Sequence, residues 1–136
     1  MTNHPRFATI GILVAVLGIG LVSTSVKADA DSTKEVATAA RHAGLAAQAA
    51  DLKGTQTHLH HVINCLVGPR GREFDDKEAN PCKDQGNGAI PDTTDEVRRT
   101  ALIQALAKAN EGLRQTDLAA ARKSASEAQV LLTPKM

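Results

Sequence analysis

Large aromatic side chains are almost absent from this chain. Its 136 residues include no tryptophan, no tyrosine and two phenylalanines. Phe7 lies in an apolar N-terminal run, which leaves Phe74 as the single large aromatic residue of the remainder. Because such rings supply much of the buried area of a typical core, a core of Ala, Leu, Val and Ile is expected to be thin and only modestly stable.

The chain also lacks an apolar run long enough to cross a membrane as a helix. Its longest, residues 7–22, has 16 residues, whereas a spanning helix needs about 20. Arg6 precedes this run, and the small residues Ala28 and Ala30 follow it. This order is typical of a secretory signal peptide. We therefore predict a signal peptide over residues 1–30, cleaved after Ala30 or after Ala28, and a periplasmic or secreted mature protein. An uncleaved membrane anchor is the alternative.

Strong charge of either sign is missing as well. The charged residues of the predicted signal peptide are Arg6, Lys27 and Asp29. The remaining residues, 31–136, carry 14 basic and 14 acidic side chains. A neutral chain of this length predicts one small domain, with no nucleic-acid partner and no anionic membrane surface as a partner. No stable membrane span is expected to remain after signal cleavage.

Several well-known metal and cofactor motifs are absent. The sequence has no CxxC, HExxH or CxxCH motif, so it does not predict a zinc ribbon, a zincin protease or a c-type haem protein. The carboxylates of residues 73–84 do not have EF-hand spacing, and Gly86-Asn87-Gly88 is too short for a phosphate-binding loop.

What is present is helical periodicity. Apolar residues recur at helical spacing over about 33–53, 57–67, 94–110 and 117–132. Candidate N-caps are Ser32 (with Glu35), Thr55 or Thr57, Thr93 (with Glu96) and Thr116. Short glycine-containing turns favour antiparallel neighbours. The sequence therefore predicts an all-α four-helix bundle of two antiparallel helical hairpins, joined by a long disulfide-tied loop over residues 68–92.

Two cysteines bracket the first part of that loop. A loop of this length is unusual in a compact domain unless it is functional or tied down. Cysteines of an exported protein usually pair, and a Cys65–Cys82 disulfide would stabilise the fold by about 3 kcal/mol through loop closure. We favour this disulfide over two free thiols.

Residues 58–65, His-Leu-His-His-Val-Ile-Asn-Cys, are the most distinctive stretch. At about 100° per residue, His58, His61 and Cys65 fall on one stripe beside the buried face, whereas His60 lies near 200°, apart from them. Imidazole nitrogens suit Cu, Ni or Zn. A fourth ligand is expected from His42 or from a loop carboxylate: Asp75, Asp76, Glu78 or Asp84. The alternative is that these histidines are amphipathic side chains at a helix boundary, and His42 fits a solvent-facing helix position.

The cysteine and the metal interpretations compete for one residue. If Cys65 pairs with Cys82, it is no thiolate ligand, and the site reduces to His58 and His61 with His60 or His42. A catalytic pair of Cys65 and His61 would be silenced by the same disulfide.

The segments Ala40-Arg41-His42-Ala43, Lys53-Gly54 and His58-Leu59-His60-His61 are similar to those of the small metal-binding proteins of the bacterial periplasm. These are Ala- and His-rich helical bundles in which histidines separated by glycine turns bind divalent metals such as copper. The resemblance covers residues 32–66 and, faintly, 97–132, where this chain has no histidine. It implies a metal binder, not an enzyme, with His42, His58, His60 and His61 as the matching positions.

Together these features predict an exported small helical protein that binds a divalent transition metal through a histidine cluster. The alternative is a non-catalytic structural or protein-interaction module that presents the Cys65–Cys82 loop to a periplasmic protein partner. A thiol enzyme would need both cysteines free.

Overall fold

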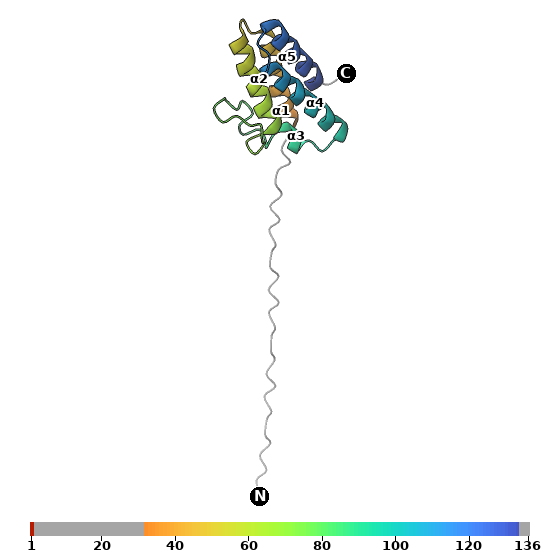
Figure 1. Cartoon of the computed structure of the whole chain (residues 1–136). Helices are drawn as coiled ribbons and strands as arrows, with labels where there is room; N and C mark the ends of the chain where they lie inside the picture. The colour runs from red at the N-terminus through yellow and green to blue at the C-terminus, as the bar shows by residue number, and fades with distance from the viewer. Residues whose placement is uncertain (2–31, 134–136) are drawn as a thin grey trace.

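Every regular element that the structure describes is an α-helix, which confirms the predicted all-α class. The computed structural model describes Met1 and residues 32–133. The helices of this part are α1 (Ser32–Gln48), α2 (Leu52–Val67), α3 (Ala89–Asp92), α4 (Glu96–Leu113) and α5 (Leu118–Leu132) (Figure 1). The predicted signal peptide and its cleavage point lie outside the described residues, apart from Met1. None of the described helices combines the length and apolarity that crossing a bilayer requires.

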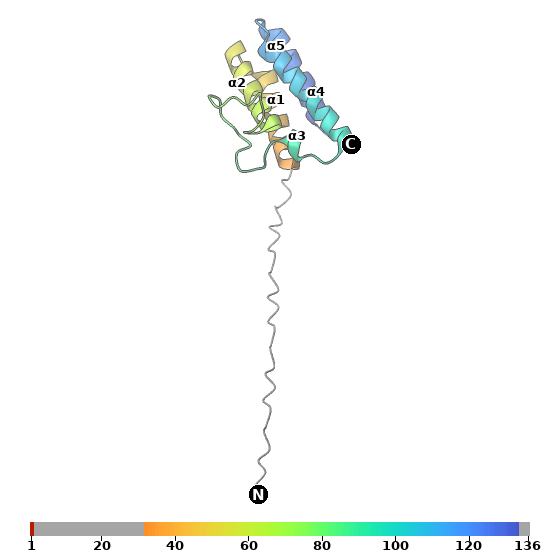
Figure 2. The same ribbon diagram turned by 60° about the horizontal axis from the view of Figure 1, so that its bottom comes forward.

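The four long helices pack as two consecutive pairs. The links of residues 49–51 and 114–117 reverse the chain, so α1 packs on α2 and α4 packs on α5. The pairs meet because α1 also contacts α5 and α2 contacts α4 (Figures 1 and 2). The short α3 contacts α1, α2 and α4. The segment between α2 and α3 runs along one side of the helices (Figure 1).

The core is built from leucines and alanines, as the composition predicts. Leu59, Leu66, Leu102 and Leu132 are fully buried, and α1, α4 and α5 add a series of fully buried alanines. Small residues let the helices approach closely. A Cβ on Gly112 would come within 2.6 Å of Leu59 Cδ1, so α4 meets α2 there without room for another side chain.

Aspartates, not threonines, start three of the long helices. The side chains of Asp51, Asp95 and Asp117 accept hydrogen bonds from the backbone N–H groups of Gly54, Arg98 and Ala120, at 2.7, 2.6 and 2.8 Å. A carboxylate satisfies a free N–H and also interacts favourably with the positive end of the helix dipole. The expected caps at Thr55 or Thr57, Thr93 and Thr116 are therefore wrong.

Because of these caps, the observed helix boundaries differ from the predicted ones. The first helix ends at Gln48, not near residue 53, and α2 begins at Leu52, not 57. Gly54 lies in the first turn of α2, not at the end of α1. Similarly, α4 spans Glu96–Leu113 where 94–110 was expected. The predicted loop 68–92 also contains the extra helix α3, closed by hydrogen bonds from Asp92 N to Gly88 O and from Thr93 N to Ala89 O.

The long loop is fastened at both ends. The predicted disulfide is confirmed: Cys65 and Cys82 are bonded, with Cα atoms 5.2 Å apart. Where the loop returns, Gly68 (φ 66°) crosses Gly88 (φ 119°) backbone to backbone, and a Cβ on Gly68 would lie 1.7 Å from Asn87 O. Buried Glu35 on α1 also accepts a hydrogen bond from Gly88 N at 2.8 Å. These contacts explain how so long a segment adopts one conformation.

Candidate metal centre

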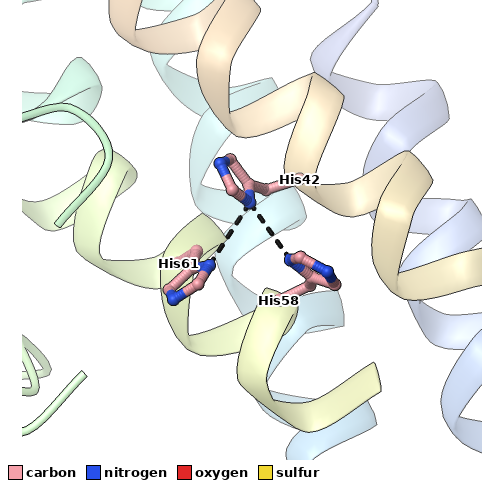
Figure 3. A group of neighbouring side chains, drawn as sticks. All are labelled: His42, His58 and His61. Carbon is pink, nitrogen blue, oxygen red and sulfur yellow. Dashed lines mark hydrogen bonds between the residues drawn. The ribbon is translucent and has the colours of Figure 1, made fainter. Parts of the chain in front are cut away.

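Three histidines from two helices face one another between α1 and α2. His42 lies on α1, and His58 and His61 lie one turn apart on the same face of α2 (Figure 3). All three are half-buried, and one ring nitrogen from each lies within 4.8 Å of the other two. The ring centroids are 4.9–5.5 Å apart. The structure thus brings together three of the four histidines expected as ligands.

The nitrogens converge on His42. Its Nδ1 lies 3.2 Å from Nδ1 of His58 and 3.3 Å from Nδ1 of His61. Nitrogen ligands about 2.0–2.1 Å from a tetrahedral zinc ion are separated by roughly 3.3–3.4 Å. Two edges of the triangle therefore already have the dimensions of a coordination site.

Two chemical arrangements account for these contacts. In the first, the single lone pair of His42 Nδ1 accepts a hydrogen bond from the protonated Nδ1 of His58 or of His61. In the second, all three Nδ1 atoms carry lone pairs and share one cation. A neutral imidazole has one protonated and one free ring nitrogen, so both arrangements are open to neutral histidines. The second leaves each Nε2 protonated.

The environment favours the neutral form of two of these rings. Burial, followed by the charges that His61, His58 and Arg41 carry when protonated, lowers the pKa of His42 from 6.5 to about 4. Burial and then His58 also lower the pKa of His61, although Glu78 opposes this shift. Both rings are therefore neutral at pH 7, the form in which an imidazole binds a metal ion.

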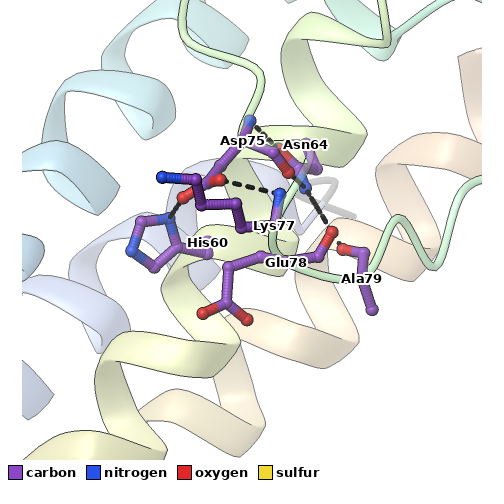
Figure 4. Close-up of polar contacts among 6 residues, drawn as sticks. All are labelled: His60, Asn64, Asp75, Lys77, Glu78 and Ala79. Atoms are coloured by element: carbon purple, nitrogen blue, oxygen red, sulfur yellow. Dashed lines mark hydrogen bonds and ion pairs between the residues drawn. The ribbon is translucent and has the colours of Figure 1, made fainter.

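His60 lies apart from the other three. Its Nδ1 is 3.4 Å from Asp75 Oδ2, on the side of α2 that the loop covers (Figure 4). This position agrees with the separate angle predicted for His60 on the helix. Among the histidines considered as ligands, His60 is thus a partner of the loop, while His42, expected at a solvent-facing position, is at the centre of the cluster.

Asn64 holds the loop against α2, and the sequence analysis did not identify it. Its side chain is fully buried. Its Nδ2 donates to the carbonyl oxygens of Asp75 and Ala79 at 2.9 and 3.2 Å, and its Oδ1 accepts from Asp75 N at 2.9 Å (Figure 4). The available signal in the sequence was an amide between the apolar residue Ile63 and Cys65, one turn beyond His60. Such a residue needs partners when buried.

This clamp determines where the loop carboxylates lie. Asp75 is close to His60, and the Glu78 carboxylate is near enough to His61 to raise its pKa. Of the four carboxylates expected as a fourth ligand, Glu78 is the one whose charge affects the pKa of a histidine of the cluster, His61. Cys65 is bonded to Cys82 and so is not a thiolate ligand.

Comparison with known proteins gives no relative for this arrangement. No protein-family model, no curated protein and no solved structure matches the chain. The function must therefore be argued from the histidine site itself.

Proposed function

We propose that this protein binds a divalent transition metal ion, Cu²⁺, Ni²⁺ or Zn²⁺, through His42, His58 and His61. The observation that carries the proposal is the convergence of three Nδ1 atoms from two helices, with separations of 3.2 and 3.3 Å about His42. Imidazole nitrogens suit these three metals. The fourth position is filled by water or by Glu78 after a side-chain rotation.

The proposed role is binding, not catalysis. A thiol enzyme would require free cysteines, and both cysteines of the chain are in the disulfide. The resemblance to the small periplasmic metal-binding proteins points the same way, now through His42, His58 and His61 and not through His60. A protein of this kind buffers or carries a metal ion.

Isothermal titration with each metal ion tests the proposal, and His60 supplies a matched control. His42→Ala and the His58→Ala/His61→Ala double variant are expected to lose affinity by more than the 10–100-fold typical of residues that merely support a ligand. His60→Ala, on the same helix but paired with Asp75, is expected to bind as the unchanged protein does. Equal binding by the His42→Ala variant would refute the site.

The proposal also covers the location of the protein and the arrangement of its helices. A disulfide is typical of oxidising compartments, which supports an exported protein, periplasmic or secreted. The contacts of α1 with α2 and α5, and of α4 with α5 and α2, support a four-helix bundle. N-terminal sequencing of protein recovered from the periplasmic fraction would test export and cleavage after Ala30 together.

A second candidate function is a protein-interaction module. It is favoured by the loop of residues 68–88, which is fastened by Cys65–Cys82 and by the Gly68–Gly88 crossing, while most of its charged side chains, apart from Asp75 and Glu78, remain exposed. A periplasmic protein partner would recognise this loop. Pull-down with a loop-scrambled variant as control tests it, and equal recovery of a partner by both proteins would count against it.

A further inference from the structure

A cleft that the histidine cluster does not line lies at the C-terminal end of α2. It has a volume of about 470 Å³ and is formed by the end of α2, the start of the long loop, α3 and α4. Its size is within the range of small-molecule binding sites, about 300–1,000 Å³. None of His42, His58 and His61 lines it.

The floor of this cleft is apolar. Val67, Ile90, Ile103 and Leu106 contribute to it. Ile103 is 51% exposed, although its neighbour Leu102 on α4 is fully buried. Contact with water costs about 25 cal/mol per Å² of apolar surface, so an apolar ligand body that covers Ile103 would gain binding energy.

Arginines surround this apolar floor. Arg70, Arg72 and Arg99 all line the cleft, and Glu73 is the one acidic residue that does so. Glu73 is already engaged, because its carboxylate accepts a hydrogen bond from Asn110. Three guanidinium groups against one carboxylate give the lining a net positive charge, although residues 31–136 as a whole have no net charge. Guanidinium groups bind carboxylates through paired, charge-assisted hydrogen bonds.

Hydrogen bonds and close packing fix the residues around the cleft. Arg70 is fixed at the rim by a 3.1 Å hydrogen bond from its Nη2 to Asn87 Oδ1. Arg99 donates to the Thr93 carbonyl and to Glu96. Gly71 packs so tightly on α2 that a Cβ there would lie 2.5 Å from Val67 Cβ. A site that is already formed loses little entropy when a ligand binds.

We propose that this cleft binds a small amphipathic carboxylate, with its apolar body over Ile103 and its anionic head between Arg70 and Arg72. The charge of the rim selects the anionic head, and the apolar floor selects the body. The proposal is independent of metal binding, because the two sites share no residue.

Calorimetric titration with decanoate, and with 1-decanol as an uncharged control, tests the proposal. Decanoate is expected to bind at least about tenfold more tightly than decanol, as charge-assisted hydrogen bonds to the head require. Arg70→Gln/Arg72→Gln is expected to remove this preference while leaving decanol binding unchanged. Both arginines are exposed, so the variant is expected to fold.

A pair of substitutions on α4 tests the position of the apolar body. Ile103→Asp is expected to weaken decanoate binding by about tenfold or more, since it places a like charge on the floor. Val97→Asp is the matched control, because Val97 is 83% exposed on the same helix and does not line the cleft. No decanoate binding, equal binding of decanol, or unchanged decanoate binding by the Ile103→Asp variant would each overturn the proposal, whatever the result for metal ions.

Discussion

Nδ1 of His42 lies 3.2 Å from Nδ1 of His58, although the two residues are 16 positions apart and belong to different helices. The contact depends on how α1 and α2 are aligned. In an antiparallel pair, residues equally far from the turn lie side by side. The link of residues 49–51 is centred on residue 50, so position 42 is paired with position 58. The geometry of the turn therefore creates the histidine cluster.

The cluster should make stability depend on pH in a predictable direction. The pKa of His42 is about 4 in the folded protein, against an ordinary value of 6.5. Between these values the unfolded chain binds more protons than the folded protein does, so the free energy of unfolding rises with pH. We expect the metal-free protein to be most stable above about pH 6.5 and to lose stability as the pH falls toward 4.

Urea denaturation at pH 7, 6, 5 and 4 measures this effect, with His42→Gln as the control. Glutamine keeps a polar side chain at this position but does not titrate. The variant should lose part of the pH dependence in this window, while the acidic groups that both proteins share titrate equally. Identical pH profiles for the two proteins would show that His42 is not buried as described.

Among the polar residues that hold the loop, Asn64 on α2 should be the most sensitive to substitution. Asn64→Ala leaves the N–H of Asp75 and the carbonyl oxygen of Ala79 without this partner, while the Asp75 carbonyl keeps its longer hydrogen bond from Glu78 N. Each unsatisfied buried group costs about 1–3 kcal/mol, so a loss of stability of several kcal/mol is expected at most, reduced wherever water reaches the freed groups.

Limited trypsin digestion shows whether that loss is local. The loop contains exposed cleavage sites at Arg72, Lys77 and Lys83. Asn64→Ala should accelerate cleavage there more than cleavage in the helices. Gln104→Ala, which shortens an exposed amide side chain on α4, is the control. Cleavage of the loop at the same rate in both variants would contradict the clamp.

The sequence predicted the helices better than it predicted their alignment. Periodicity and the two cysteines were sufficient for the all-α class, the disulfide and the separate position of His60, because each depends largely on local spacing. His42 was different. A turn near residue 55, as first expected, would have paired position 58 with position 52 and left His42 without a partner. This shift of five residues in one turn explains why the sequence offered His42 only as a possible fourth ligand, while the structure places it at the centre of the cluster.

The cap that determines this turn can be tested directly. Asp51→Ala removes the acceptor of the Gly54 N–H and is expected to cost about 1 kcal/mol of stability. Because the same aspartate begins α2, it also helps to keep His42 beside His58. Thr57→Ala, at a position expected from the sequence to cap α2, should have a smaller effect. Thermal unfolding of both variants decides between the two caps, and a larger effect at Thr57 would contradict the observed helix start.

The disulfide connects the order of the loop to the proposed metal site, and its removal distinguishes between water and Glu78 as the fourth ligand. Cys65→Ala/Cys82→Ala is expected to lower the free energy of unfolding by about 2–5 kcal/mol. The three histidines lie on α1 and α2, so they should still bind a metal ion. If Glu78 supplies the fourth ligand, however, freeing the loop should also weaken binding.

Comparing this variant with Glu78→Gln resolves the question. When Glu78 is a ligand, both changes should reduce metal affinity, and the reduction should not be additive when they are combined. When water occupies the fourth position, both should bind as the unchanged protein does, apart from the loss of the Glu78 charge near His61. Calorimetry below the unfolding temperature of each variant measures the affinities, and loss of all binding on removal of the disulfide would show that the two helices alone do not hold the histidine cluster together.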